Sequence, residues 1–583
     1  MKRILFLLIA LTVAAFAGWY YWNFFQNISS LPMAALLPRE TIFVAQMPDF
    51  DRAWDDWEHC DIYQLYRERA VQDFLRKPMA NISKGDVAPR TLQEIKQLAP
   101  KNAFIALTSI DNNNPKLVGG FRCRGNKEEA EGIIDRWRSG LMGQNSSVKI
   151  EKVQYQRHEI QVAKAAPFSI ATVYDPPWFF AASEVSELER LLDRADRRAS
   201  SEDDRLDKDD VYRAAILHRP SNSVASFYFQ PKAFSQRLAE LRAAVGSSSA
   251  ANDGTLLEKM RCIAGWMRFE NKKMHDIVFL GMPKLEQGRT LTRSSQSLGT
   301  KETFLFLATL LNLGERMDTL NQVAALAGTK IFQALGDSGI TDADWKAAFG
   351  VELGALADWP SNARWPSFLV TLPVRDPAKA QKILDAFLHG DEEGSWAQTE
   401  KDGVRYFSRQ SVASFVAVAP TIGLSDRIVI AGLNPASVEE ALKRITSGSS
   451  EFGESQSYKE AAGLLPAPTN FFAYIDTALL YSRLDASLRP MLLMAAAFLP
   501  AMGNSIDPGK LPAAEVVTKH LSPIVSSQTY ASDGYLAESI GPITLDQLGI
   551  GVAILSSLGT AARQTAWSTS ATSRPASSPS PTP

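Results

Sequence analysis

The residues able to do metal or acid–base chemistry are few in this chain and widely spaced. None of its six histidines belongs to an HExxH motif or a helical HxxxH pair, the spacings that place two imidazoles on one zinc ion. The nearest approach to a ligand pair is His59-Cys60, close to Asp55, Asp56 and Glu58. Because adjacent residues on a helix point in different directions, we expect a solvated helix face there and no metal site. The histidines are His59, His158, His218, His275, His389 and His520.

The sequence also lacks the motifs of common nucleophiles and phosphate-binding loops. A serine hydrolase elbow needs Gly-x-Ser-x-Gly, and Gly423-Leu-Ser425 lacks the second glycine. A dinucleotide-binding turn needs three spaced glycines, and Gly549-Ile-Gly551 supplies two. We therefore predict no catalytic, cofactor-binding or metal-binding residue, and no cofactor.

Paired carboxylates are the remaining source of acid–base chemistry. Asp203-Asp204 and Asp209-Asp210 lie in the charged stretch Asp193–Asp210, which we expect to be a solvated linker or helix face. Thr341-Asp-Ala-Asp344 has the pattern of a helix N-terminus, where acidic side chains favour the positive end of the helix dipole. Neither group of carboxylates is expected to be catalytic.

The composition excludes several classes of protein. The chain has 583 residues, of which 45% are hydrophobic and 22% charged, as in ordinary globular proteins. A net charge of −2 provides no global field to attract nucleic acid, so we expect no nucleic-acid partner. Cys60, Cys123 and Cys262 are too few for a disulfide scaffold, and we expect buried, idle thiols, with one bridge left possible.

The N-terminus predicts export from the cytoplasm. Lys2 and Arg3 precede an apolar run, Ile4–Gly18, and an aromatic cluster follows. Ala15-Phe16-Ala17 fits a signal-peptide cleavage site. The stretch to Phe25 is alternatively about 33 Å of helix, long enough to cross a bilayer, with the aromatic residues at the interface. We favour an uncleaved signal-anchor helix over residues 1–26 in a bacterial inner membrane, with the bulk of the chain in the periplasm; cleavage would release it there.

The C-terminus is expected to lie outside the fold. Residues 546–562 form a short apolar segment, whose run Leu548–Leu558 falls short of the 17–25 residues of a spanning helix. Residues 563–583 are mostly Ser, Thr, Ala and Pro, a composition that buries too little to fold. We expect this tail to be disordered.

An internal repeat is the strongest signal in the sequence. Tyr212–Pro220 aligns with Tyr458–Pro466 without gaps, and Ala225–Phe229 aligns with Phe471–Ile475 at the same offset of 246 residues. Two further blocks align at an offset of 250 residues. They are Val118–Arg122 over Phe368–Leu372, and Trp178–Ala182 over Ile428–Gly432.

The repeat predicts the fold class and the domain boundaries. Each half ends on an expected hairpin, Ile263–Leu280 turning near Asn271-Lys272 and Ile524–Ile540 turning at Asp533-Gly534. Hairpins and irregularly spaced helices indicate an α+β fold, with a mixed or antiparallel sheet covered by helices on one face. We expect a tandem duplication, with halves at residues 36–290 and 298–545.

This pattern resembles a family of bacterial exported proteins of unknown function, DUF3352. The resemblance rests on Leu36-Leu37-Pro38, the strand-like Thr41–Ala45 and Pro48–Asp51, and on the returning block from Leu464 to Asp476. It covers most of residues 36–545. It implies an N-terminal export segment and an α+β repeat architecture, and it implies no activity.

These observations favour a non-enzymatic binding or scaffolding component of the cell envelope. Its partners would be the membrane, through the N-terminal helix, and an envelope protein or an apolar ligand at a cleft between the halves. Two alternatives stay open. A deep apolar cavity between a curved sheet and its helices would favour a carrier of a lipid. A His or Ser beside a buried carboxylate would favour an envelope hydrolase with a dispersed active site.

Overall fold

The computed structural model describes most of the chain between residues 32 and 549. The expected segments 1–26 and 563–583 lie outside the described residues, as does most of 546–562. Among the described residues, no helix is long and apolar enough to cross a membrane. The described ranges are 32–82, 87–111, 114–123, 127–143, 149–165, 168–197, 204–234, 259–284, 289–310, 340–389, 396–409, 418–447, 450–498 and 507–549.

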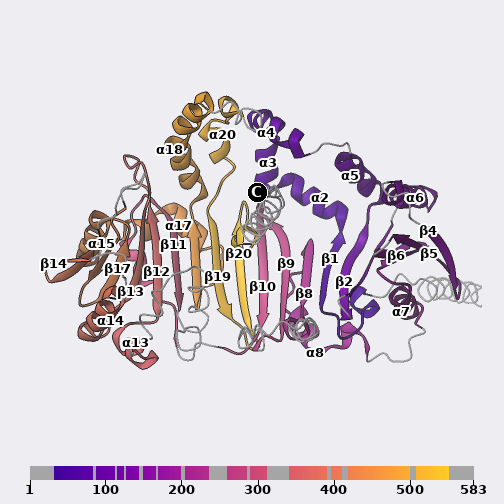
Figure 1. Cartoon of the computed structure of the whole chain (residues 1–583), viewed down its shortest axis with the longest axis horizontal. Coiled ribbons are helices and arrows are strands. Elements are labelled where there is room, and N and C mark those ends of the chain that lie inside the picture. Colours follow the sequence, from indigo (N-terminus) through magenta and orange to yellow (C-terminus); the bar gives the residue numbers. More distant parts are fainter. Residues whose placement is uncertain are drawn as a thin grey trace, which may run out of the picture.

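Twenty strands form one continuous antiparallel sheet, which runs across both halves of the chain (Figure 1). The pairings give the order β4-β5-β6-β7-β3-β2-β1-β8-β9-β10 for the first half. The first-half strands are β1 (Phe43–Asp49), β2 (Lys101–Asp111), β3 (Asn114–Arg122), β4 (Lys149–Tyr155), β5 (His158–Ala165), β6 (Phe168–Asp175), β7 (Trp178–Ala182), β8 (Ala225–Phe229), β9 (Cys262–Glu270) and β10 (Lys273–Gly281).

The second half continues the sheet from β10 through β20, in the order β20-β19-β18-β11-β12-β13-β17-β16-β15-β14. Read from its own outer edge inward, each half therefore has the same sequence of pairings. The second-half strands are β11 (Thr303–Leu310), β12 (Glu352–Asp358), β13 (Ser367–Pro373), β14 (Ala397–Lys401), β15 (Val404–Ser408), β16 (Thr421–Leu424), β17 (Ile428–Gly432), β18 (Phe471–Ile475), β19 (Ile524–Tyr530) and β20 (Tyr535–Gly541).

The two halves meet edge to edge and not at a cleft. Seven residue pairs join β10 to β20 in the middle of the sheet, from Met274 opposite Gly541 to Leu280 opposite Tyr535. The expectation of a ligand cleft between the halves is therefore wrong at this seam, because the hairpins that end each half use their free edges to pair with each other.

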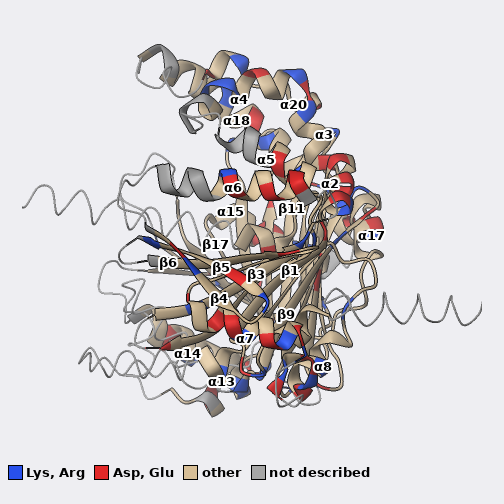
Figure 2. Ribbon diagram, turned by 90° about the vertical axis from the view of Figure 1, so that its right-hand side faces the viewer, with Lys and Arg blue, Asp and Glu red and all other residues tan. Residues whose placement is uncertain are grey.

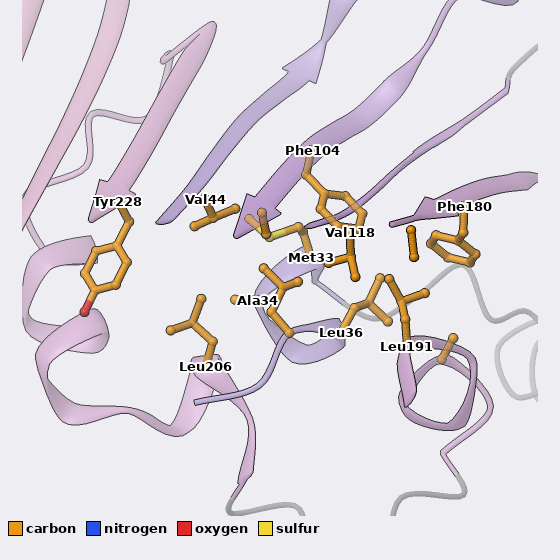
Figure 3. Packing of buried hydrophobic residues seen from close by; sticks show 14 of the residues in the cluster. Met33, Ala34, Leu36, Val44, Phe104, Val118, Phe180, Leu191, Leu206 and Tyr228 are labelled. Atoms are coloured by element: carbon orange, nitrogen blue, oxygen red, sulfur yellow. The ribbon is translucent and has the colours of Figure 1, made fainter. Parts of the chain in front are cut away.

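One face of the sheet carries the main hydrophobic core of each half. In the first half, Met33, Leu36, Leu191 and Leu206 pack with strand residues such as Phe104 (Figure 3). In the second half, residues of η5, α15, α16 and α17 cover the same face. The core-face elements are η2 (Met33–Leu36), α7 (Val185–Ala195), η4 (Leu206–Lys208), α8 (Asp210–Ile216), η5 (Ser294–Leu298), α15 (Pro435–Ser447), α16 (Glu451–Glu454) and α17 (Gln456–Ala462).

Helices also lie against the opposite face, so the expectation of helices on one face is wrong. Ala130 and Ile133 of α6 pack with Phe121, and Leu480 of α18 packs with Trp359. Strands such as β2 are apolar on both faces, which therefore both need cover. Figure 2 shows α2–α6, α18 and α20 above the strands and α7 and α8 below. In the second half α13 and α14 also lie on the face opposite the main core, because they pack against Leu372 and Val429, which alternate with the core residues Leu369 and Ile430. The remaining helices are α2 (Phe50–His59), α3 (Asp61–Arg67), α4 (Arg69–Ile82), α5 (Val87–Leu98), α6 (Lys127–Gly143), α13 (Asp342–Ala348), α14 (Pro377–His389), α18 (Thr477–Phe498), η6 (Pro508–Lys510) and α20 (Ala514–Thr518).

Both predicted hairpins and the predicted helix start are present. The turn between β9 and β10 is Asn271-Lys272, with φ of 50° and 66° at the two residues, as a two-residue hairpin turn requires. The turn between β19 and β20 includes Asp533-Gly534. Thr341 caps α13 with a reciprocal hydrogen bond to Asp344, so this carboxylate is a capping group.

Two details of the sequence interpretation need correction. Val118 stands opposite Ala106, and the residue at that ladder position in the second half is Leu369, opposite Leu356, and not Phe368. A shift of one residue moves a side chain to the other face of a sheet, and Phe368 is indeed exposed. The charged stretch 193–210 is also not a solvated linker throughout, because Leu206 is fully buried in the core.

Candidate ligand-binding groove

A groove of about 790 Å³ lies on the first half of the sheet, on the face opposite the main core. Strands β1, β2, β3, β6, β7 and β8 form its floor and walls. The described residues that line it include no Asp, Glu, Lys, Arg or His. Its interior is therefore suited to an uncharged, apolar ligand.

The floor of the groove is made of small residues in register on neighbouring strands. Ala45 pairs with Ile105, Ile105 pairs with Gly119, and Gly119 pairs with Ala181, so this row crosses β1, β2, β3 and β7. The next row on the same face pairs Met47 of β1 with Ala103 of β2, another small residue of the floor. A Cβ atom on Gly119 would stand 2.9 Å from the carbonyl oxygen of Phe104, so only glycine fits there without a backbone shift.

Larger apolar side chains flank this floor and are left in contact with solvent. Ile105 is 53% exposed, Ile170 41% and Leu117 38%. Phe121 and Phe179 pack together at one side with tilted rings, whose centroids lie 5.2 Å apart. Apolar side chains this exposed on adjoining strands are a surface that a ligand or partner would cover.

Two of the four polar residues that line the groove, Ser169 and Ser183, are hydrogen-bonded to the protein backbone. Ser183 Oγ accepts a hydrogen bond from the Leu117 N–H at 3.0 Å, and Ser169 Oγ donates to the Ser183 carbonyl at 2.9 Å. These hydroxyls therefore stabilise the strands and leave the walls without a charged anchor for a head group.

Three of these ladder positions carry larger side chains in the second half. Leu307 stands at the position of Ala45, and Leu353 at that of Ala103. Val370 stands at the position of Gly119, whereas the position of Ile105 holds the smaller Ala355. The strand order is the same in both halves, so the two surfaces differ in the sizes of these side chains.

Two buried histidines do contact carboxylates, which is the feature that would favour a hydrolase. His158 Nε2 lies 3.0 Å from Asp196 Oδ2, and its Nδ1 lies 3.4 Å from Asp175 Oδ2. Because carboxylates face both ring nitrogens, neither nitrogen is left to accept a proton from a serine or cysteine, as a catalytic triad needs. His158 is therefore a structural histidine that ties β5 to the end of α7.

His275 has the same arrangement at the seam between the halves. Its Nε2 lies 3.1 Å from Glu538 Oε2 on β20, and its Nδ1 lies 3.0 Å from Glu270 Oε2 on β9. The hydrogen bond from His275 lowers the pKa of Glu270 against a smaller opposing effect of burial. This cluster holds three adjacent strands together and faces the core.

The sequence candidates at His59-Cys60 and the other cysteines are not brought into a common site. His59 is exposed at the end of α2, whereas Cys60 follows the helix and is buried. The described residues include no group of three possible metal ligands. Cys60, Cys123 and Cys262 are free and buried, and burial raises the pKa of Cys123 and of Cys262 to about 11. Thiols held in the protonated form are poor nucleophiles.

Sequence reasoning missed the groove, although one signal was present. In β2 the alternating residues Phe104 and Ala106 face the core, and Ile105 between them is also apolar. A strand that is apolar on both faces predicts cover on both faces or an exposed apolar surface. The small size of Ala45, Gly119 and Ala181 becomes informative only once the register places them in one row on the same face of the sheet.

Comparison with known proteins finds two weakly similar solved structures and no matching family or curated protein. No family model matches the chain, which leaves the resemblance to DUF3352 untested, and no curated protein matches it. Two solved structures are weakly similar, crystal forms I and III of TP0453, with TM-scores of 0.23 and 0.25 and 7% sequence identity. They cover 44% and 45% of this chain and 81% and 84% of their own chains. Similarity this low carries no argument about fold or function.

Proposed function

We propose that the chain is a non-enzymatic lipid-binding protein of a bacterial cell envelope, and that the groove holds an acyl chain. The observation that carries the proposal is the groove itself, an open, uncharged surface whose walls include the exposed side chains of Ile105, Leu117 and Ile170. Its volume of about 790 Å³ lies within the usual range for small-molecule sites, roughly 300–1,000 Å³.

The chemistry of the walls favours an acyl chain over a polar ligand. Each methylene group moved from water into the groove contributes about 0.8 kcal/mol, so a long chain gains affinity without any polar contact. A sugar or peptide would instead lose hydrogen bonds to water that the lining residues offer few groups to replace. The head group of the lipid is expected to stay at the open side, in contact with water.

The hydrolase alternative has weaker support from the same residues. Its best candidates, His158 and His275, have both ring nitrogens directed at carboxylates, and neither lines the groove. A scaffold without a ligand would have no need of a floor built from Ala45, Gly119 and Ala181. A lipid-binding role accounts for the small-residue floor and needs no catalytic histidine.

We also propose the duplication and the location expected from the sequence. The identical order of pairings in the two halves supports a tandem duplication of a ten-strand unit. After the duplication, substitutions to Leu307, Leu353 and Val370 would have filled the groove in the second half. Alternatively, substitutions to smaller residues at the corresponding positions would have opened it in the first half. The apolar run Ile4–Gly18 supports anchoring or export, with the sheet in the periplasm.

Native mass spectrometry tests the proposed ligand. The full chain is released from the envelope of its own host in mild detergent, and the bound masses are identified after dissociation. We expect a lipid or fatty acid on the wild-type chain, and less of it on an Ala45→Leu variant, which fills the groove floor. A chain that carries no lipid, or that carries equal amounts in both variants, would contradict the proposal.

A further inference from the structure

A second apolar surface lies at the end of the helices above the sheet, away from the groove walls. We call it the arch tip and define it as four residues near the C-terminal end of α18. Phe498 is 82% exposed, Met494 58%, Leu493 47% and Leu492 38%. Apolar side chains this exposed and this close in sequence are unusual for a soluble surface.

The apolar character of α18 extends around the helix and not along one stripe. At 100° per residue, Leu492, Leu493 and Met494 point in three well-separated directions, and all three are exposed. The eight residues Met491–Phe498 are all Met, Leu, Ala or Phe. A helix that is apolar all round is suited to a hydrophobic environment and not to a groove on one side.

The helix is nevertheless held firmly to the body of the protein on its N-terminal side. Arg483 donates a hydrogen bond to the Trp359 carbonyl at 2.9 Å, and Leu480 packs with Trp359. Arg489 pairs with Asp485 and donates to the Leu511 carbonyl at 3.0 Å. The last two turns are therefore presented on a fixed base.

Basic side chains lie on elements next to α18. Arg76 of α4 and Lys510 of η6 are exposed. Of the nearby carboxylates, Asp507 lies 4.0 Å from Lys77. Glu515 of α20 acts on Arg489, whose pKa is raised by its hydrogen bond to Asp485 and further by Glu515. Cations around an apolar surface complement the anionic head groups of a bilayer.

We propose that the arch tip inserts into the surface of a bilayer that contains anionic lipids. Leu492, Leu493, Met494 and Phe498 enter the interfacial region, and the basic residues beside them contact the phosphates. This goes beyond the proposed acyl-chain site and does not depend on it, because the groove-filling substitution Ala45→Leu leaves the tip unchanged.

The position of the tip separates this contact from any made by the N-terminal segment. The described chain enters the fold at η2, beside the Phe43 end of β1, where Met33 packs near Val44 (Figure 3). Helix α18, which carries the tip, lies beyond the opposite strand ends, above the sheet in Figure 1. A bilayer that binds the arch tip would therefore contact the end of the molecule opposite to η2.

A pair of labelled variants tests the proposal on the full chain. Leu493→Cys places an NBD fluorophore at the tip, and Leu217→Cys places it on an 85% exposed leucine just after α8, at the other end of the sheet. The three native cysteines are buried and should label little. The chain is kept in lipid nanodiscs, and phosphatidylcholine liposomes with or without phosphatidylglycerol, some carrying nitroxide lipid, are added.

We expect the NBD emission of the L493C variant to shift to shorter wavelength and to be quenched by nitroxide lipid. The nitroxide lipid can be in the liposomes or in the nanodisc. The L217C label should do neither, and the effect should weaken without phosphatidylglycerol or at high salt. An unchanged L493C label would overturn the proposal, as would equal responses at both positions. A shift that depends on protein concentration and not on liposomes would assign the tip to a second copy of the chain, and would also overturn it.

Discussion

Replacing Ala45 by leucine should fill the floor of the groove and weaken acyl-chain binding without disturbing the sheet. Ala45 lies at the β1 end of the row that forms the groove floor, paired with Ile105 on β2. Leucine already stands at the equivalent position, Leu307, in a strand of the same pairing order, so the backbone tolerates it. The substitution therefore gives this one position the side chain found in the second half.

The size of the effect follows from the volume that the new side chain takes. Leucine adds three carbon atoms to alanine and displaces about three methylenes of a bound chain. At about 0.8 kcal/mol for each buried methylene, the loss is about 2.4 kcal/mol, or roughly a 50-fold increase in Kd. A groove wide enough for the chain to bend around the introduced leucine would show a smaller loss.

The assay is a fluorescence titration with cis-parinaric acid, a long-chain fatty acid that fluoresces when it leaves water. Ala355→Leu is the matched control, because Ala355 lies on the same face of β12 in the second half and is similarly half-buried. We expect the control to bind as the wild type does. If A45L remains folded by circular dichroism and binds the probe with wild-type affinity, the groove is not the acyl-chain site.

Three further predictions concern stability. Burial raises the pKa of Glu352, but the hydrogen bonds that it accepts from Thr292 and Ser294 outweigh this effect and lower the pKa. Glu352→Gln should therefore reduce the free energy of unfolding, measured by urea denaturation, by about 2–4 kcal/mol. Glu400→Gln, on the exposed strand β14, should leave it unchanged. Phe306→Ala, at a fully buried ring, should cost about 3–5 kcal/mol in the same assay, and a loss below about 1 kcal/mol would contradict the packing. Burial and the nearby Asp276 raise the pKa of Asp546 to about 6, above its unfolded value, so its contribution to stability is full below about pH 4 and is lost as the pH rises through about 6. The free energy of unfolding of Asp546→Asn, relative to that of the wild type, should therefore rise by up to about 3 kcal/mol as the pH increases from about 4 to about 6. Denaturation at each pH measures this difference, and a difference that does not change with pH would refute the prediction.

The fold could be predicted from the sequence as far as local patterns reach. The hairpin turns at Asn271-Lys272 and Asp533-Gly534 and the cap at Thr341 are set by residues close in sequence, and all three are present. The alignment at Val118 was one residue out, because Val118 and its neighbours are compatible with either face until the partner strand fixes the register.

The groove and the joining of the halves depend on contacts that no local pattern records. The seam pairs Met274 with Gly541, residues far apart in the chain, and nothing in either hairpin alone indicates that its free edge finds the other. The groove needs Ala45, Gly119 and Ala181 in one row across the sheet, although each is an ordinary small residue in its own strand. The same reasoning explains why buried histidines such as His275 could not be told from catalytic ones before their carboxylate partners were known.

The most direct test of the central claim is to map where a lipid contacts the chain. A photoactivatable fatty acid is added to the full chain and cross-linked, and the modified peptides are identified by mass spectrometry. The account predicts adducts on the groove walls, at Ile105, Leu117, Ile170 and Phe179, and their loss in A45L. Adducts confined to the second half, or equal labelling of A45L and the wild type, would contradict it.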